Sequence, residues 1–444
     1  MRRVGKEVRR ILAHPRAPTV ALVLILVFSA GARLFAIGRP CSAPCKRDSD
    51  HSLIFDEAYY VNAARVIDGI NPPAGAPYNG SPPHKDPNAE HPQLAKLIVA
   101  GGIKLFGDNP WGWRLGSVIF GLSAIWGMYF LARSAGGGPW LSVGVAGIAA
   151  LDNLLLIHGR IATLDIYALA LMIIAGGLYL RGKPWAAGVI LGIGSCMKLV
   201  ALFLIPALVL YELMQVEWAR RDGAGIARPA RSRAIPLAIQ IGATVVTLLL
   251  GLWLLDALVP SYDPGTQTTY AGNPFAHLSH MISFASKLKA VPNATGISST
   301  PWQWLVDQKP IDYSRVAVNQ VSGGKIVASR ALFAAKGEVN PFILLVLFPA
   351  LFAAVAGAWR ERDRLATIGA AWCIGTFVPF AVQATLMDRI SYLYYILIVM
   401  PGIYLVTARL FSPSRVGRAA TIGWTVALLY SFIDLYPVRS FTGH

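Results

Sequence analysis

Long apolar stretches separated by short polar segments dominate the chain. The first runs from Thr19 to Gly38, about 20 residues, which is the length a helix needs to cross the hydrocarbon core of a bilayer. Further apolar stretches follow at residues 111–132, 139–157, 161–181, 185–197, 199–213, 235–256, 341–359, 365–383, 391–409 and 418–436. The pattern therefore predicts an all-α polytopic membrane protein with about 11 transmembrane helices.

One apolar region has an unusual length for a membrane span. The stretch from 184 to 213 has about 30 residues, which is long for one tilted helix and short for two. Gly188, Gly192, Gly194 and the charged Lys198 stand in its middle. We therefore expect two short helices that meet near the outer face of the membrane.

Basic residues indicate how the predicted spans are oriented, because Lys and Arg are concentrated in cytoplasmic loops. The segment before the first span carries Arg2, Arg3, Lys6, Arg9, Arg10 and Arg16, so the N-terminus is predicted to be cytoplasmic. The first apolar run lacks a clear small-residue cleavage site, and we expect it to be retained as a helix. With an odd number of crossings, the other inner loops are basic as well, at 133, 181–183, 220–233, 360–364 and 409–418. Two long loops, about 39–109 and about 258–340, are then extracytoplasmic.

The composition agrees with a membrane protein and excludes a soluble one. Charged residues make up 14% of the chain, whereas soluble domains contain about 25%. The basic inner loops account for the net charge of +17, so we expect a lipid bilayer and no nucleic acid as partner. The sequence has no visible repeats, so residues 1–444 are predicted to form a single membrane-embedded domain. The protein is predicted to reside in the plasma membrane.

Ionisable residues at the edge of a membrane bundle are costly, so they are candidates for function. Several segments, far apart in the sequence, carry such residues to the predicted outer side. They are FDEAYY with Asp56 and Glu57, EHPQLAK with His91 and Lys96, HGRIATLD with Arg160 and Asp165, GSCMKLVALF with Lys198, and MDRISYLYY with Arg389. Their convergence on one face predicts a functional site there.

The residue types suit group transfer from a lipid-linked phosphate. Lys198 and Arg389 are cations that an anionic phosphate leaving group needs, and Asp56 is a carboxylate that can act as a base on an acceptor hydroxyl. No Gly-rich nucleotide loop is present, which fits a donor that carries its own leaving group. Asp48 and Asp50 match the Asp-x-Asp pattern of metal-dependent transferases, but a charged loop is the preferred interpretation, and we expect neither metal nor cofactor. His277 and His280 are expected on the surface of the second long loop.

The motifs, taken together and in order, resemble the bacterial protein O-mannosyltransferase family, which is glycosyltransferase family 39. They are FDEAYY, HPQLAK, RIATLD, MKLVALF, STPWQWLVDQKPIDY and the R-x-S-Y-x-Y-Y pattern, and they cover the chain almost end to end. Each motif is weakly specific alone, whereas the ordered set is fairly specific. The resemblance implies the GT-C glycosyltransferase fold, a polyprenyl-phosphate-linked sugar donor, and Ser or Thr hydroxyls of exported proteins as acceptors for mannose.

The resemblance also implies roles for individual residues. The catalytic acid pair of the family corresponds to Asp56 and Glu57, with Asp56 as the base. Residues expected to bind the lipid phosphate or donor are Arg160, Lys198 and Arg389. Supporting residues are His91, Lys96, Asp165, Trp302 and Trp304. Gln93 and Ala95 depart from the family, which more often has Pro and Gly there, and the departures leave the acceptor open.

Structural roles compete with these assignments. Glu57 can pair with a nearby Arg or Lys, Asp165 can pair with Arg160, and the tryptophans fit an interfacial aromatic belt. The alternative functions are transfer from the same donor to a lipid or cell-wall glycan, and a transporter or lipid flippase. Transporters commonly have inverted repeats and broken helices at the midplane, and this sequence shows neither clearly. Cys41 and Cys45 share an outer loop, and a disulfide between them stays open.

Overall fold

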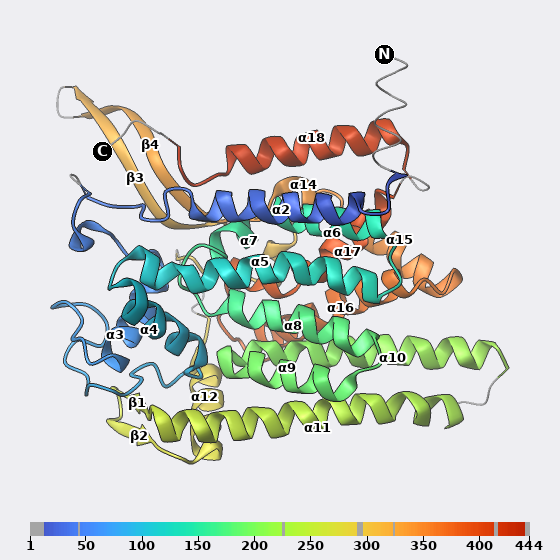
Figure 1. Cartoon of the computed structure of the whole chain (residues 1–444), viewed down its shortest axis with the longest axis horizontal. Helices are drawn as coiled ribbons and strands as arrows, with labels where there is room; N and C mark the ends of the chain where they lie inside the picture. Colours follow the sequence, from blue (N-terminus) through green and yellow to red (C-terminus); the bar gives the residue numbers. More distant parts are fainter. Residues whose placement is uncertain are drawn as a thin grey trace.

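The computed structural model describes residues 13–42, 45–223, 227–290, 296–322, 325–412 and 416–439. Long helices lie side by side in stacked layers, with their axes roughly parallel (Figure 1). The basic residues Arg2 to Arg10, on which the orientation of the N-terminus partly depends, lie outside the described residues.

Each predicted apolar span falls on one helix or on two shorter helical segments that follow each other. The bounds are α2 (Ala17–Leu34), α5 (Pro110–Ser134), α6 (Pro139–Ala150) with α7 (Asn153–His158), α8 (Asp165–Leu180), α9 (Pro184–Met197), η2 (Leu199–Phe203) with α10 (Leu204–Arg221), α11 (Ala227–Leu258), α14 (Pro341–Leu344) with α15 (Leu347–Arg360), α16 (Arg364–Leu386), η3 (Leu393–Ile398) with α17 (Met400–Leu410), and α18 (Arg418–Asp434). Five helices of the described chain are long and apolar enough to cross a membrane unaided, so eleven crossings stay a prediction.

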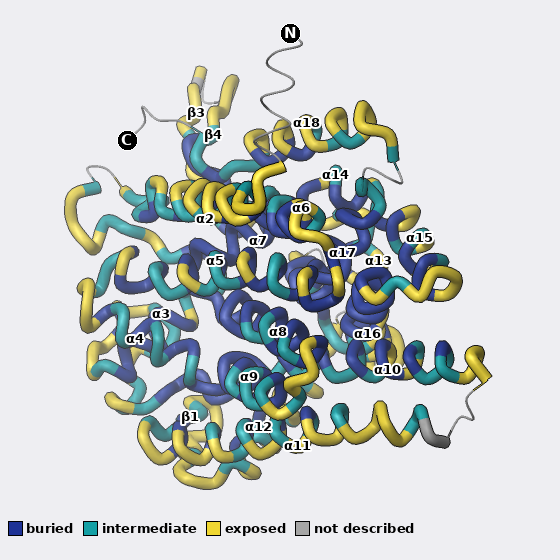
Figure 2. Tube along the Cα trace, turned by 45° about the vertical axis from the view of Figure 1, so that its right-hand side comes forward, coloured by how far each residue is buried: buried dark blue, intermediate teal, exposed yellow. Residues whose placement is uncertain are grey.

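Burial separates the helices into an inner and an outer set. α8 is buried along nearly its whole length, whereas α2, α11 and α18 expose large apolar side chains such as Val27, Leu250 and Ile433 (Figure 2). An apolar surface of this extent is compatible with lipid and not with water. The outer helices therefore provide the surface that a bilayer would cover.

The expected break at Lys198 is confirmed. α9 ends at Met197, Lys198 has extended backbone angles, and η2 begins at Leu199. Gly188 and Gly192 let α9 pack closely on α11, because a Cβ at either position would collide with α11. The break places the Lys198 side chain at the end of α9 and not inside a continuous apolar helix.

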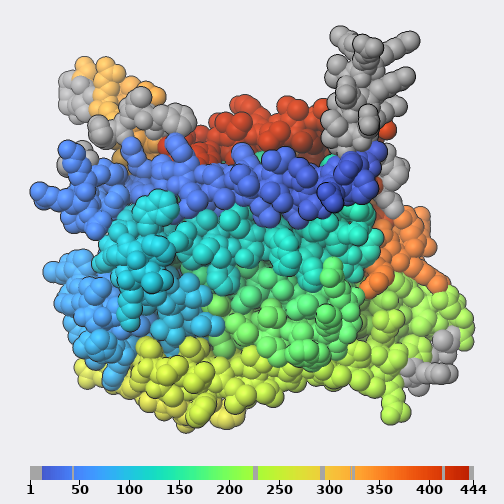
Figure 3. All heavy atoms as spheres, viewed as in Figure 1, coloured from blue at the N-terminus to red at the C-terminus, as the bar shows by residue number. Residues whose placement is uncertain are grey.

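The two long loops gather at one end of the helices, on the left in Figures 1 and 3. The first contains α3 (Glu57–Ile67) and α4 (Leu94–Phe106), and the second contains α12 (Pro274–Lys287) and α13 (Pro301–Trp304). The second also contains two antiparallel hairpins, β1 (Ser261–Asp263) with β2 (Thr268–Tyr270) and β3 (Ile311–Ser322) with β4 (Lys325–Gly337). The sequence analysis did not anticipate these strands.

Backbone hydrogen bonds join the two loops. The Asp86 N–H donates to Pro260 O at 3.0 Å, and the Tyr262 N–H donates to Asp86 O at 2.7 Å. In the first loop, Cys41 and Cys45 form a disulfide, while Cys196 and Cys373 are buried packing residues. The loops therefore form a connected layer over one end of the bundle.

Candidate active site

Asp56 lies at the start of α3, at the end of the bundle that the two loops cover. It is partly exposed, and no group of the described residues donates a hydrogen bond to its carboxylate. Burial raises the pKa of this carboxyl to about 7, opposed by the Lys198 ammonium and reinforced by the Asp165 carboxylate. A reachable carboxylate with a pKa near neutrality is suited to accept a proton.

A strained turn presents Asp56. Phe55, the residue before it, has a φ of +53°, which is unfavourable for a bulky side chain. Two aromatic contacts hold the Phe55 ring, which stacks on Tyr313 with centroids 4.2 Å apart and meets the edge of Tyr394 at 5.5 Å. These contacts stabilise the turn and thereby fix where the Asp56 side chain begins.

Glu57, next to Asp56, points into the protein. It is fully buried, and its carboxylate receives two hydrogen bonds from Arg114, at 2.7 and 2.8 Å. It also accepts the backbone N–H groups of Ile54 at 2.7 Å and Ala162 at 2.8 Å. All these contacts are with protein groups, so Glu57 ties the first loop to α5 and to the segment before α8.

Asp165 and Lys198 form a buried ion pair close to Asp56. The Lys198 Nζ lies 2.8 and 2.9 Å from the two Asp165 carboxylate oxygens, and 5.8 Å from the centre of the Tyr394 ring. Asp165 therefore pairs with Lys198 and not with Arg160. Arg160 instead donates to the carbonyl oxygens of Phe35 and Ala36 after α2, at 3.2 and 3.0 Å.

His158 and Tyr313 are site residues that the sequence analysis did not single out. The His158 Nε2 lies 2.9 Å from the Tyr313 hydroxyl, and its Nδ1 lies 3.0 Å from Thr163 Oγ1. His158 is also close to Tyr394, with ring centroids 5.7 Å apart. Tyr313 belongs to STPWQWLVDQKPIDY, a motif of the resemblance, and His158 belongs to HGRIATLD, the segment singled out for Arg160 and Asp165, so both lie in segments that the sequence marks.

Lys96 fixes the loop that carries His91. The Lys96 side chain is fully buried, and its Nζ contacts Asp86 Oδ2 at 2.5 Å, Asn88 O at 2.6 Å and His91 O at 2.9 Å. Burial, reinforced by the Lys198 and Lys96 charges, lowers the pKa of the His91 imidazole well below its ordinary value. His91 is therefore neutral and lies within the field of the Lys198 charge.

A second buried cluster holds the same loop from the other side. We define the Gln93–Asp256–His277 clamp by its contacts: Gln93 Nε2 donates to Asp256 Oδ1 at 2.6 Å, and His277 Nδ1 lies 2.9 Å from the same oxygen. His277 Nε2 lies 3.0 Å from Ala89 O. All three side chains are fully buried, so the expectation that His277 lies on the loop surface is wrong. The chain buries this histidine because α12 folds back over the first loop.

The remaining candidates lie in the second loop and beside it. Arg389 is half-buried and donates to Ala285 O at 3.1 Å and Gln383 Oε1 at 3.3 Å. Trp304 is fully buried and donates through Nε1 to Ser299 Oγ at 3.0 Å, whereas Trp302 is 57% exposed. Trp304 therefore supports the loop, and Trp302 is available for contacts outside the chain.

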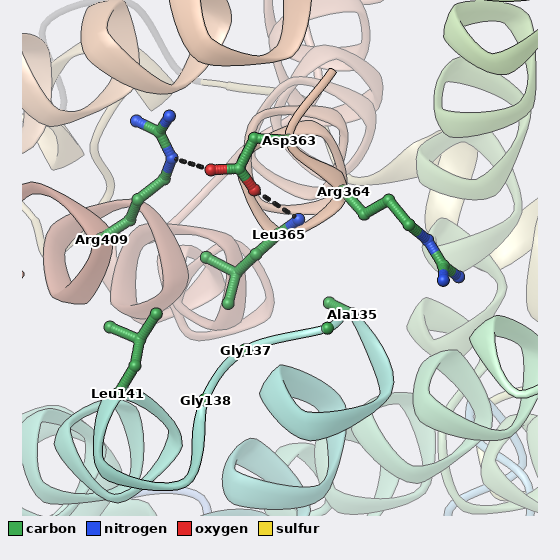
Figure 4. Close-up of a pocket in the computed structure, with 9 residues that line it drawn as sticks. Ala135, Gly137, Gly138, Leu141, Asp363, Arg364, Leu365 and Arg409 are labelled. Atoms are coloured by element: carbon green, nitrogen blue, oxygen red, sulfur yellow. Dashed lines mark hydrogen bonds and ion pairs between the residues drawn. The ribbon is translucent and has the colours of Figure 1, made fainter. Parts of the chain in front are cut away.

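A cavity of about 330 Å³ lies at the opposite end of the bundle and is separate from these residues. Its walls are the turn between α5 and α6, the start of α16 and the end of α17 (Figure 4). The Arg409 guanidinium at its edge is already paired with Asp363 at 2.6 Å and Glu361 at 3.1 Å. No uncompensated charge of Arg409 is therefore available there for an anionic ligand.

One group of three described side chains has the spacing of metal ligands, namely Cys41, Cys45 and His51. The two cysteines of this group form the disulfide of the first loop. A disulfide sulfur is not a thiolate, which is the form that binds metals.

Comparison with known proteins shows what the chain is similar to in sequence and in fold. Residues 90–224 match the family model described as dolichyl-phosphate-mannose-protein mannosyltransferase. The polyprenol-phosphate-mannose–protein mannosyltransferase of Corynebacterium glutamicum is 25% identical over 404 residues, covering 78% of this chain and 75% of the relative. The predicted resemblance is thus confirmed.

Solved structures agree on the architecture. The Saccharomyces cerevisiae protein O-mannosyltransferase Pmt1–Pmt2 complex bound to the sugar donor has a TM-score of 0.67 at 12% identity, with 95% of this chain and 90% of that chain covered. ArnT from Cupriavidus metallidurans bound to undecaprenyl phosphate has a TM-score of 0.55 at 16% identity, with coverage of 93% and 64%. The predicted GT-C fold is confirmed.

Proposed function

Because the chain is a membrane glycosyltransferase of the GT-C fold that is similar to protein mannosyltransferases, we propose that it transfers mannose from a polyprenyl phosphate to Ser or Thr hydroxyls of exported proteins. The observation that carries the proposal is the Asp56 carboxylate, which no described group saturates, beside the Asp165–Lys198 ion pair.

The proposed reaction is a single inverting displacement. Asp56 accepts the proton of the acceptor hydroxyl as its oxygen attacks the anomeric carbon of the sugar. The bond between that carbon and the phosphate oxygen breaks on the opposite face, and the electron pair leaves with the lipid phosphate. Lys198 and Arg389 stabilise the charge that develops on the phosphate.

The other site residues hold the reacting groups and the loops that carry them in position. Asp165 orients the Lys198 ammonium through both carboxylate oxygens, while Glu57 and Arg114 hold the turn that carries Asp56. Lys96 and the Gln93–Asp256–His277 clamp fix the loop of His91, which we place at the donor. Trp302 is exposed and can stack on a sugar or an acceptor. Arg160, the third proposed donor cation, points toward the end of α2 and donates to backbone carbonyl oxygens there.

We propose that this site faces the extracytoplasmic side of the plasma membrane. A reporter enzyme that is active only outside the cytoplasm should be active when fused after Gly80, in the first long loop. The same reporter should be silent when fused after Gly223, in a loop that carries several arginines. The opposite result would reverse the orientation and remove the exported proteins as acceptors.

The Gln93–Asp256–His277 clamp offers a test of the donor-side loop. Gln93→Ala or His277→Gln removes one buried contact, so the loop of His91 should loosen and the donor KM should rise roughly fivefold to a hundredfold. Because the two residues meet at Asp256, the double variant should be little worse than either single one. His280→Gln is the matched control, since His280 lies on the same helix but contacts Asp263, at 3.9 Å, and the Tyr270 ring, at 4.9 Å, and does not belong to the clamp. Additive effects, or an equal effect at His280, would contradict this role.

The whole proposal is tested with purified protein in lipid and radiolabelled polyprenyl-phosphate-mannose, with peptide and glycan acceptors offered side by side. Transfer to the peptide hydroxyl supports the proposal. Transfer to glycan alone favours the alternative acceptor with the same donor. Absence of transfer, combined with movement of the labelled lipid between leaflets, favours a flippase.

A further inference from the structure

The β3–β4 hairpin connects the candidate site with the space outside the bundle. It pairs from Ile311 with Gly337 at its foot to Ser322 with Lys325 near its tip, and it projects beyond the helices at the upper left of Figure 1. Most of its side chains between 315 and 330 are exposed. Because its outer part is exposed, packing against the bundle does not explain the length of the hairpin.

The foot of the hairpin is part of the candidate site. Tyr313 is buried, stacks on Phe55 next to Asp56, and contacts His158 through its hydroxyl. Gly337 makes room for this ring, because a Cβ at that position would overlap the phenol of Tyr313. The first residues of β3 therefore run directly into the neighbourhood of Asp56.

The two edges of the hairpin differ. The edge of β4 is covered near its foot by the chain's own C-terminal segment: the Ala334 N–H donates to Pro437 O at 2.8 Å, and the Arg439 N–H donates to Leu332 O at 2.9 Å. On β3, no backbone group from 314 to 322 bonds to any described residue other than those of β4. An unpaired edge of this kind is a template for another strand.

We propose that the free edge of β3 is the docking site for the acceptor polypeptide. An extended segment pairs with residues 314–322 as an added strand and continues past Tyr313, which brings its Ser or Thr hydroxyl to Asp56. This inference rests on the proposed function, because it needs a polypeptide acceptor. Backbone pairing explains how one site can accept many sequences, since main-chain hydrogen bonds do not depend on the side chains.

The exposed side chains of the hairpin indicate which segments it favours. Val316 and Val318 of β3 are exposed by 38% and 55%, and such residues pack on the side chains of a neighbouring strand. Arg315 and Arg330 are exposed, and no acidic residue occurs between 314 and 330. The acceptor segment is therefore extended, poor in proline, and neutral or acidic around its hydroxyl residue.

The test uses a synthetic peptide with one Thr, in which each backbone amide is N-methylated in turn. In a paired strand every second N–H points to the partner, so methylation should raise the peptide KM about tenfold or more at alternate positions and little between them. A variant in which residues 316–331 are replaced by a short turn keeps Tyr313 and Gly337. It should show a similar rise in peptide KM with an unchanged donor KM.

The outcomes separate the two proposals. If the wild type glycosylates the peptide but methylation has no alternating effect, or the shortened variant has a normal peptide KM, the docking site is overturned and the activity stands. If the wild type glycosylates no peptide, the protein acceptor fails and the docking site fails with it. A shortened variant that loses only dimerisation or vesicle binding, with its peptide KM unchanged, overturns the site in favour of a second copy or a membrane surface.

Discussion

Replacing Lys198 by alanine is expected to raise the donor KM or lower turnover by roughly tenfold to a thousandfold, the scale of losing a charge-assisted contact to a phosphate. Lys198 stands at a helix break, its charge acts on the Asp56 carboxyl, and both oxygens of Asp165 hold its ammonium in place. Its removal takes away the positive charge that we propose to face the leaving group. Arg389→Ala is expected to act in the same direction, because Arg389 is half-buried at the rim of the same end. Donor kinetics in reconstituted membranes measure both effects.

A second variant distinguishes chemistry from stability. Lys198→Ala leaves the Asp165 carboxylate buried and unpaired, which by itself destabilises the fold by several kcal/mol, about 3–5. The double variant Asp165→Asn with Lys198→Met removes that unpaired charge, so its folding should recover while its donor kinetics stay impaired. Lys46→Ala, at an exposed lysine of the first long loop, is the control for a general loss of positive charge. Recovery of activity in the double variant, or normal donor kinetics in Lys198→Ala, would rule out this role for Lys198.

The positions of the apolar helices were predictable from the sequence because the signal is local. A run of apolar residues must leave water wherever the chain places it, and the glycines with Lys198 mark the break between α9 and η2 in the same local way. The positions of the helix ends also predicted that the charged residues cluster at one end of the bundle. The sequence could therefore indicate the end of the bundle at which Asp56 lies.

The partners of the charged residues were not predictable in this way. Arg160 stands only five positions before Asp165, yet Asp165 pairs with Lys198, which is 33 positions further along. The choice depends on how α8 and α9 pack, and no local pattern records it. Glu57 is similar, since its partner Arg114 is 57 positions away on another helix. Pairing across elements is decided by three-dimensional geometry.

The second long loop was the least predictable part. Apolar and polar residues do not alternate regularly along its strands, and that alternation is what identifies a strand in a sequence. β3 and β4 also pair with several irregularities in their register. His277 was expected on the surface because it belongs to a predicted outer loop. It is buried because the first loop supplies Ala89 and Gln93 as a cover, together with Asp256 at the end of α11. Gln93, the departure from the family pattern, is thus explained by a contact that only the fold reveals.

The largest loss is expected from Asp56→Asn. An amide has nearly the size of the carboxylate but cannot accept the proton of the acceptor hydroxyl, so turnover should fall at least roughly a hundredfold to ten-thousandfold. Folding should be spared, because no group of the described residues donates a hydrogen bond to the Asp56 carboxylate. Donor binding should survive, since Lys198 and Arg389 are unchanged. Asp48→Asn, at an exposed aspartate of the same loop, is the matched control and should have normal activity.

The pH dependence provides an independent check on the same residue. Burial raises the pKa of the Asp56 carboxyl to about 7, and the base must be deprotonated to act. Turnover in the wild type should therefore fall as the pH drops through about 7 and reach a plateau above it. The residual activity of Asp56→Asn should lack this transition, because an amide does not titrate. Glu57→Gln should behave differently again, with reduced expression or thermal stability but the same pH transition, since its charge balances the buried Arg114. Near-normal turnover in Asp56→Asn with normal expression, or an unchanged pH transition in that variant, would show that another group is the base.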